Sequence, residues 1–241
     1  MIVNLLEDGW EVIYHRAHAL LAAQIAGHWC RQNAPTRFYE TIAAISHHDD
    51  LEREFEEHQL TAAGAPLDFT LDGESSIDEL RTHIQNARYR GRWVTLLISR
   101  HLCFLHQARA GTSPDWDAFL EEQRQQQAQW RSALGVSEEA AEEAYQFMRW
   151  CDRLSLILAQ RRIPASQRAL EITRDLQGQR YDLRQMGDRL TVEPWPFEEP
   201  AFTVDVEATY LPQLHFEDNA ALIAALQEAP IRVLEWHFAK A

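Results

Sequence analysis

Hydrophobic and polar positions along the chain follow three successive patterns. Short apolar runs at residues 2–6 and 10–14 flank Asp8-Gly9, a pair typical of the turn of a β-hairpin. From residue 15 to about residue 160, apolar residues recur at the spacing of amphipathic helices. From Tyr181 onward, short runs rich in β-branched and aromatic residues indicate strands. The pattern predicts a hairpin, then helices, then a β-rich C-terminal part.

The expected elements are bounded by turn and capping residues. We predict helices over residues 15–31, 35–49, from 77 onward, 93–109, 115–134 and 137–160. We predict strands over residues 180–183, 190–192, 202–208 and 231–238, with a short helix at 220–227. Residues 51–75 form a long connection, beginning with a charged stretch at 52–57, that we expect to cover a site.

These elements predict a mainly α fold with a small antiparallel sheet. The N-terminal hairpin and the late strands would share that sheet beside an all-helical core. We divide the chain into a helical core with its hairpin, residues 1–180, and a β-rich extension, residues 181–241, which packs on the core to give one compact unit.

Composition narrows the function classes. The 241 residues carry 23 basic and 37 acidic side chains, a net charge of −14, and Lys240 is the only lysine. Such a chain is a poor binder of nucleic acid, whose affinity depends on neutralising phosphates. The sequence shows neither a signal peptide nor an apolar run long enough to span a membrane, and its three cysteines lie far apart. We therefore expect a cytoplasmic protein with reduced thiols.

The clearest candidate chemistry is the run His47-His48-Asp49-Asp50, which ends an apolar helical segment. An imidazole and a carboxylate in such a place are costly to bury unless they are partnered, and a metal cation satisfies both. Other histidines and one aspartate also lie inside apolar runs: His18, His83, His101 and Asp152. Each has an ordinary alternative: His18 and Asp152 as buried side chains with a protein partner, and His83 as an exposed histidine on a partly polar helix.

The order His18, then His48-Asp49, then Asp152 on successive helices resembles the HD superfamily of metal-dependent phosphohydrolases. The resemblance implies an HD-domain-like helical core whose His, His-Asp pair and late Asp hold a divalent metal. In members with two metals, two further histidines lie between the pair and the last Asp, where His83 and His101 fall. The chain departs from the family in lacking a glycine after the pair.

A second resemblance covers nearly the whole chain. The chain is similar to a bacterial family known only as a domain of unknown function, through Met1-Ile2-Val3 with Asp8-Gly9-Trp10, the His47–Asp50 run, Asp152-Arg153-Leu154-Ser155-Leu156 and Pro194-Trp195-Pro196-Phe197. Members carry Gly-Trp where this chain has Leu51-Glu52. We expect the Pro194–Phe197 segment to be a structural clamp, with Trp195 lining a pocket as the lesser alternative. This family implies no activity.

The HD resemblance implies a hydrolase that acts on a phosphate ester, with one or two ions of Fe, Mn, Co, Ni or Zn activating water. Asp49 and His101 are the candidate catalytic residues, within a ligand set of His18, His48, Asp49, His83, His101 and Asp152. Arg88, Arg92 and Arg153 are candidates for binding a small anionic substrate. Two alternatives stay open: a di-iron oxygenase using the same ligands, and a scaffold that binds without turnover.

Overall fold

The structure is a computed structural model that describes residues 1–51, 59–71, 75–166 and 168–241. Its helices are α1 (His15–Gly27), α2 (Phe38–Ser46), α3 (Ile77–Ala87), α4 (Arg92–Leu105), α5 (Pro114–Leu134), α6 (Glu138–Ala159) and α7 (Asn219–Glu228). Its strands are β1 (Ile2–Leu6), β2 (Gly9–Ile13), β3 (Leu170–Arg174), β4 (Arg180–Met186), β5 (Arg189–Glu193), β6 (Ala201–Leu211) and β7 (Ile231–Ala239).

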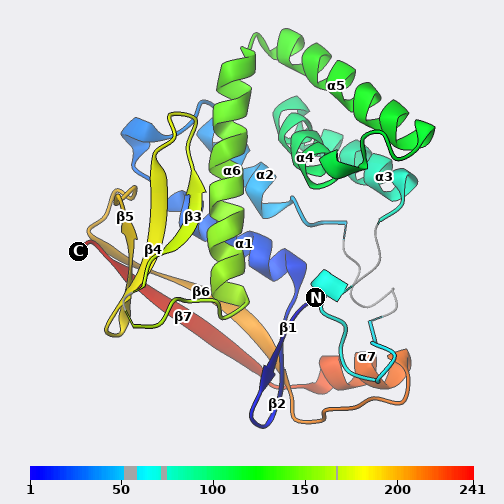
Figure 1. The fold of residues 1–241 in the computed structure, drawn as a ribbon, viewed down its shortest axis with the longest axis vertical. Coiled ribbons are helices and arrows are strands. Elements are labelled where there is room, and N and C mark those ends of the chain that lie inside the picture. The colour runs from blue at the N-terminus through cyan, green and yellow to red at the C-terminus, as the bar shows by residue number, and fades with distance from the viewer. Residues whose placement is uncertain (52–58, 72–74, 167) are drawn as a thin grey trace.

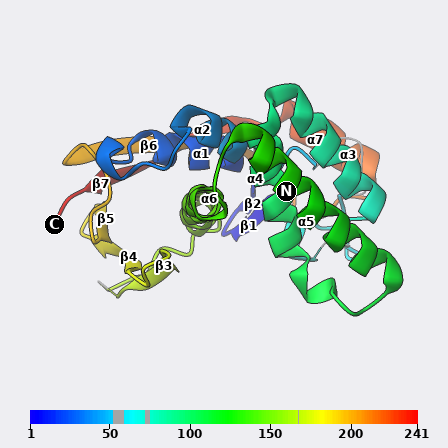
Figure 2. The same ribbon diagram turned by 90° about the horizontal axis from the view of Figure 1, so that it is seen from above.

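All of these strands belong to one sheet, in the order β1-β2-β6-β7-β5-β4-β3. Neighbouring strands are antiparallel, except that β5 and β7 run parallel. Figure 2 shows that the part from β6 to β3 curves around α6, which is seen end-on. The sheet is therefore a half-barrel wall, and α6 lies along its concave side.

The predicted fold class is wrong. The structure is 49% helical and 22% strand, so it is a mixed α/β architecture rather than a mainly helical, HD-like core with a small antiparallel sheet. The error has two sources. The last strand, β7, pairs with β6 on one side and β5 on the other, which joins all the strands into one mixed sheet. In addition, the pattern did not reveal β3, where Ile172 is the only fully buried residue.

The individual elements agree better with the sequence pattern. The hairpin β1–β2 turns at Asp8-Gly9, and every predicted helix and strand has a counterpart with boundaries shifted by a few residues. The division into residues 1–180 and 181–241 stays a prediction. One sheet extends across this boundary: β1, β2 and β3 precede residue 180, β4 begins at it, and β5 to β7 follow it. The charged stretch 52–57 lies outside the described residues.

Local capping explains where three of the helices begin. The hydroxyls of Ser76, Ser113 and Ser137 accept hydrogen bonds from backbone N–H groups in the first turns of α3, α5 and α6. Helix α6 then buries one side over its whole length, including Met148, Cys151 and Leu158. Within the described part of the chain, no helix is both long enough and apolar enough to cross a membrane.

The Pro194–Phe197 segment joins the sheet to the helices, as expected of a clamp. The backbone N–H of Cys30 donates to the carbonyl oxygen of Pro196 at 2.9 Å, and that of Glu198 donates to His28 at 2.8 Å. The buried ring of Phe197 packs against Trp29 and Trp150. The end of α1 is thereby fixed to the connection between β5 and β6.

Candidate metal centre

Four helices bring their functional side chains to one buried place. His18 lies on α1, His101 on α4 and Asp152 on α6, while His48 and Asp49 lie in the turn that follows α2. Helix α6 contacts α1, α2 and α4. Figure 1 shows α6 at the middle of the molecule, with α1 passing behind it and α4 to its right. The three imidazoles are at most 3% exposed.

The Nε2 atoms of His18 and His48 lie close to the same carboxylate oxygens of Asp49 and Asp152. The Nε2 atom of His18 lies 3.2 Å from Asp49 Oδ2 and 3.4 Å from Asp152 Oδ1. The Nε2 atom of His48 lies 3.5 Å from Asp49 Oδ2 and 3.3 Å from Asp152 Oδ1. Neither Nε2 atom forms a hydrogen bond of proper geometry with a described residue.

These separations match those expected of atoms that share a cation. Nitrogen and oxygen ligands about 2.1 Å from one divalent ion are about 3.0 Å apart in octahedral geometry and about 3.4 Å apart in tetrahedral geometry. Two overlapping groups meet this description: His18 with His48 and Asp49, and His48 with His101 and Asp152. The residues present therefore fit a metal.

Hydrogen bonds behind the cluster fix the imidazole tautomers. The Ser155 hydroxyl donates to the Asp152 carbonyl at 2.8 Å, so its oxygen accepts from His18 Nδ1, also at 2.8 Å. His48 Nδ1 donates to the carbonyl of Ile45 at 2.7 Å. When neutral, both rings thus carry their proton on Nδ1 and leave Nε2, which faces the cluster, to bind a metal, the arrangement that a metal-binding histidine needs.

The cluster is strongly coupled electrostatically. Burial alone would lower the pKa of His48, but the charges of Asp49 and Asp152 outweigh it and raise that pKa to about 10. The pKa of His18 is raised for the same reason, against its burial. Burial would raise the pKa values of Asp49 and Asp152, yet the two imidazoles hold both well below their usual range. The site thus favours two carboxylates together with positive charge.

His101 and His83 occupy different positions. The ring of His101 lies perpendicular to that of His48, with centroids 5.1 Å apart, and its Nδ1 has no hydrogen-bond partner among the described residues. Burial and the neighbouring His48 lower its pKa to about 4, so it is neutral. His83 belongs to neither donor group; its Nε2 donates to the carbonyl of His48 at 3.0 Å. His83 thus supports the backbone of a ligand.

A cavity of about 210 Å³ lies against the cluster. His101 and Asp152 form part of its wall, together with Arg149, Arg153 and the apolar side chain of Phe104. The Arg149 guanidinium is stacked on Phe104, 3.8 Å from the ring centroid. Arg153 forms no ion pair with a described residue. The cavity therefore joins candidate metal ligands to two guanidinium groups.

The other two predicted substrate arginines lie elsewhere. Arg88 and Arg92 are exposed and line no described part of this cavity. Arg92 is nine residues before His101 on α4, which places its backbone about 13 Å away along the helix axis. In the basic turn before α4, Arg90 forms an ion pair with Asp50 at 3.1 Å.

Sequence reasoning missed the residues that orient the imidazoles and one that lines the cavity. Ser155 follows Asp152 by three residues on α6, a spacing that puts the two on one helix face. The spacing of three residues from a candidate ligand could therefore have marked Ser155 as a residue that supports the site. Arg149 lies three residues before Asp152 on the same helix, so the same spacing could have marked it as a residue near the site.

Comparison with known proteins gives a family and no activity. Residues 1–213 match the family described as Protein of unknown function (DUF3891). No curated protein and no solved structure matches the chain. The match spans the hairpin, every candidate ligand and the strands as far as β6. The chain therefore belongs to the DUF3891 family of proteins of unknown function.

Proposed function

We propose that this protein is a metal-dependent hydrolase that acts on a small phosphate ester. The observation that carries the proposal is the convergence of His18 Nε2 and His48 Nε2, both buried and without a hydrogen bond to a described residue, on the carboxylates of Asp49 and Asp152. Neutral imidazoles with carboxylates suit Mn, Fe, Co, Ni or Zn. A divalent ion held there would lower the pKa of bound water and polarise a phosphoryl oxygen.

The ligand geometry favours one ion per chain. His48 is common to both donor groups, and its Nδ1 is already bonded to the carbonyl of Ile45. Only its Nε2 remains, and one imidazole nitrogen binds one cation. The two groups therefore describe alternative subsets of a single centre.

The adjoining cavity supports a small anionic substrate. Arg153 and Arg149 provide positive charge beside Asp152, and guanidinium groups match the geometry of phosphate oxygens. A volume of about 210 Å³ accommodates a phosphoryl group with a small organic part. The neutral imidazole of His101 borders the same cavity and would hydrogen-bond the reacting phosphate, and the second carboxylate oxygen of Asp49 would orient the attacking water.

The order of the ligands along the chain adds support from resemblance. His18, His48-Asp49 and Asp152 follow the order found in the HD superfamily, and phosphoester hydrolysis is what that resemblance implies. The resemblance concerns the ligand residues alone. The di-iron oxygenase would need six ligands, including His83. His83 belongs to neither donor group, and its Nε2 instead donates to the backbone carbonyl of His48.

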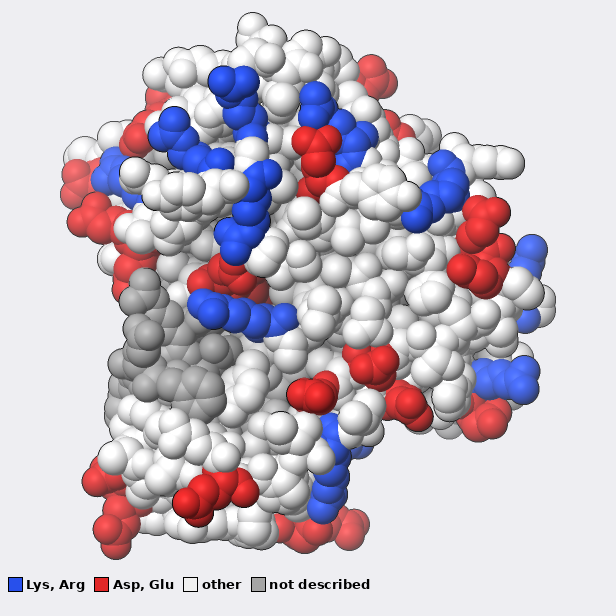
Figure 3. Space-filling model, turned by 180° about the vertical axis from the view of Figure 1, so that it is seen from behind, with Lys and Arg blue, Asp and Glu red and all other residues white. Residues whose placement is uncertain are grey.

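Other features agree with a small-molecule enzyme of the cytoplasm. The face shown in Figure 3 carries both arginine and acidic side chains. The net charge of −14 for the whole chain is unfavourable for binding nucleic acid. All three cysteines are unpaired, as in proteins of a reducing compartment.

Reconstitution tests the proposal. Chelator-treated protein is loaded in turn with Mn, Fe, Co, Ni or Zn, and phosphate release is measured from p-nitrophenyl phosphate and a panel of small alkyl phosphates. We expect release with at least one metal, its loss in Asp49→Asn, and its retention in the matched variant Asp50→Asn. Metal binding without phosphate release from any ester would overturn the hydrolase proposal and favour a scaffold that binds without turnover. Oxygen consumption by the iron form would favour the oxygenase.

A further inference from the structure

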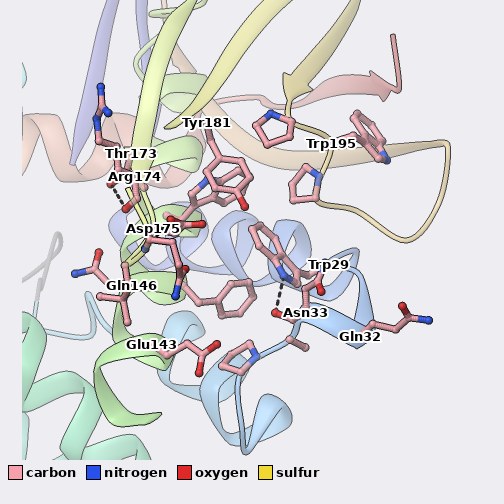
Figure 4. Close-up of a pocket in the computed structure, with 18 residues that line it drawn as sticks. Trp29, Gln32, Asn33, Glu143, Gln146, Thr173, Arg174, Asp175, Tyr181 and Trp195 are labelled. Carbon is pink, nitrogen blue, oxygen red and sulfur yellow. Dashed lines mark hydrogen bonds between the residues drawn. The ribbon is translucent and has the colours of Figure 1, made fainter. Parts of the chain in front are cut away.

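A second, larger cavity lies on another face of α6. It has a volume of about 510 Å³ and is formed by the segment after α1, α6, the β3–β4 hairpin and the connection after β5 (Figure 4). Trp150 lines this cavity, whereas Asp152 belongs to the metal centre. Residues two apart on an α-helix point about 200° away from each other, so the two cavities lie on different faces of α6.

Aromatic side chains from four parts of the chain line this cavity. Tyr181 on β4 and Trp195 in the connection after β5 are partly exposed, while Trp29 and Phe147 keep 8% and 7% of their surface exposed. The rings of Trp29 and Phe147 lie at 71° to each other, with centroids 5.0 Å apart. The ring of Tyr181 is tilted by 45° from that of Trp29. The rings therefore face in different directions and form part of a cage rather than one flat platform.

Hydrogen bonds hold two of these indoles in place. Trp29 Nε1 donates to Asn33 O at 3.3 Å, and Trp195 Nε1 donates to Glu199 O at 3.0 Å. Because both N–H groups are already bonded, these two side chains offer a ligand the carbon surface of their rings. The face of an aromatic ring carries the negative part of its quadrupole, which attracts a cation.

The opposite wall of the cavity is acidic. Figure 4 shows Glu143 and Asp175 across from Trp29 and Trp195. Glu143 is exposed and Asp175 is partly buried, and neither forms an ion pair with a described residue. The backbone N–H of Gln177 donates to Asp175 Oδ1 at 3.0 Å, which holds that carboxylate in the turn after β3. Two carboxylates thus border the same cavity as the rings.

No free positive charge balances these carboxylates among the described lining residues. Arg174 is the one basic residue among them, and it forms an ion pair with Glu171 at 3.1 Å. Burial and the charge of Asp175 raise the pKa of Tyr181, so a negative potential reaches the aromatic wall. A cation therefore gains from both walls, whereas a neutral molecule gains from the rings alone and an anion is repelled.

We infer that this cavity binds a small organic cation of the quaternary ammonium class. Such a cation spreads its charge over methyl groups that pack on aromatic faces. A metal ion would need several converging oxygen or nitrogen ligands, and Glu143 and Asp175 belong to no such group among the described residues. The volume of about 510 Å³ accommodates the cation with an attached chain. This site is independent of the proposed phosphoester hydrolysis.

Matched probes separate the effect of charge from the effect of shape. Wild-type ¹⁵N-labelled protein is titrated with choline, with the neutral alcohol in which carbon replaces the quaternary nitrogen of choline, and with glycine betaine, which adds a carboxylate. Indole N–H signals report binding, and Trp195→Leu, at a partly exposed position, identifies the signal of Trp195. If that variant does not fold, through-bond experiments on the wild type identify the signal.

We expect choline to shift the Trp195 signal saturably, and the neutral alcohol to bind about fivefold more weakly. Betaine should also bind more weakly than choline, because its carboxylate meets Glu143 and Asp175. The Trp10 signal should stay in place, since Trp10 Nε1 donates to Leu214 O outside this cavity. Chelator treatment should leave choline binding unchanged, which separates this site from the metal centre. No shift with choline, or equal binding of choline and the neutral alcohol, would overturn the inference.

The substitution Glu143→Gln tests the acidic wall. Removal of this exposed charge should weaken choline binding about threefold and leave binding of the neutral alcohol unchanged. Glu139→Gln is the matched control, because Glu139 is also exposed, lies one turn earlier on α6 and does not line the cavity. Equal choline affinities of the two variants would count against a cation site and overturn the inference.

Discussion

The hydroxyl of Ser155 accepts a hydrogen bond from His18 Nδ1 at 2.8 Å, while it donates its own proton to a backbone carbonyl of the same helix. This one contact holds a proton on Nδ1 of His18 and turns its Nε2 atom toward Asp49 and Asp152. Because Asp152 and Ser155 are both on α6, one helix supplies a ligand and the support for another ligand.

Replacing Ser155 with alanine should therefore weaken metal binding. Residues that orient metal ligands typically contribute about 10- to 100-fold in affinity, and we expect a loss of that size. Competition with a chromogenic chelator measures it. Ser46→Ala is a matched control, since the Ser46 hydroxyl likewise donates to a carbonyl three residues earlier on its helix. Equal affinities for the two variants would contradict the role assigned to Ser155.

Protons should compete with the metal at His48. The raised pKa of about 10 means that chelator-treated protein holds a proton on this ring at neutral pH, which a cation must displace. Metal binding should release protons, and affinity should rise with pH up to about 10. Calorimetry in two buffers of different ionisation enthalpy measures the release. A binding enthalpy independent of the buffer would contradict this prediction.

The same shift should affect the stability of the chelator-treated protein. Because the folded pKa of His48 exceeds its ordinary value of 6.5, its stabilising contribution is complete below pH 6.5 and lost as pH rises through about 10. We expect the unfolding midpoint to fall across this range, and to fall less in His48→Gln. Urea unfolding at a series of pH values makes the comparison. Identical pH profiles for the two proteins would disagree with this electrostatic interpretation.

His83 and His101 should respond differently to substitution. His83→Gln should leave one metal ion per chain, because His83 contacts only the backbone of His48. His101→Gln should reduce phosphoester hydrolysis by at least about 100-fold, as removal of a group that acts on the reacting atoms does. His106→Gln, just beyond the end of the same helix, is the control. Loss of a second metal equivalent in His83→Gln would instead indicate a dinuclear centre.

Arg153→Gln should raise KM for an anionic substrate by about tenfold, since a charged hydrogen bond is worth about 1.5 kcal/mol or more. Arg92→Gln should leave KM unchanged, because Arg92 lies outside the cavity. Steady-state kinetics on the best ester of the panel tests both. An effect of Arg92→Gln as large as that of Arg153→Gln would place the substrate elsewhere.

The sequence allowed local features to be predicted better than long-range ones. Serine caps and apolar spacing located α3, α5 and α6, because these signals lie within a few residues of the elements they specify. The partners of strands are not encoded in that way. The parallel pairing of β5 with β7, at Leu190 and Phe238, depends on packing across the whole domain and could not be read from alternation.

In the candidate site, too, local features were predictable from the sequence and spatial ones were not. An adjacent His48-Asp49 pair after an apolar helix was a visible signal, and the structure brings it to His18, His101 and Asp152. The direction of a side chain on its helix was not visible. His83 is as buried as His101, yet its Nε2 is bonded to a backbone carbonyl rather than turned toward the carboxylates.

The most direct test of the metal centre is elemental analysis of untagged protein after reconstitution, with Asp152→Asn and Asp50→Asn measured alongside. Asp50 is a suitable control because it follows Asp49 directly but pairs with Arg90 and His47. We predict about one equivalent of a divalent transition metal in the wild type and in Asp50→Asn, and its loss in Asp152→Asn. Metal absent from the wild type, or retained equally in all three proteins, would contradict a centre built on His18, His48, Asp49 and Asp152.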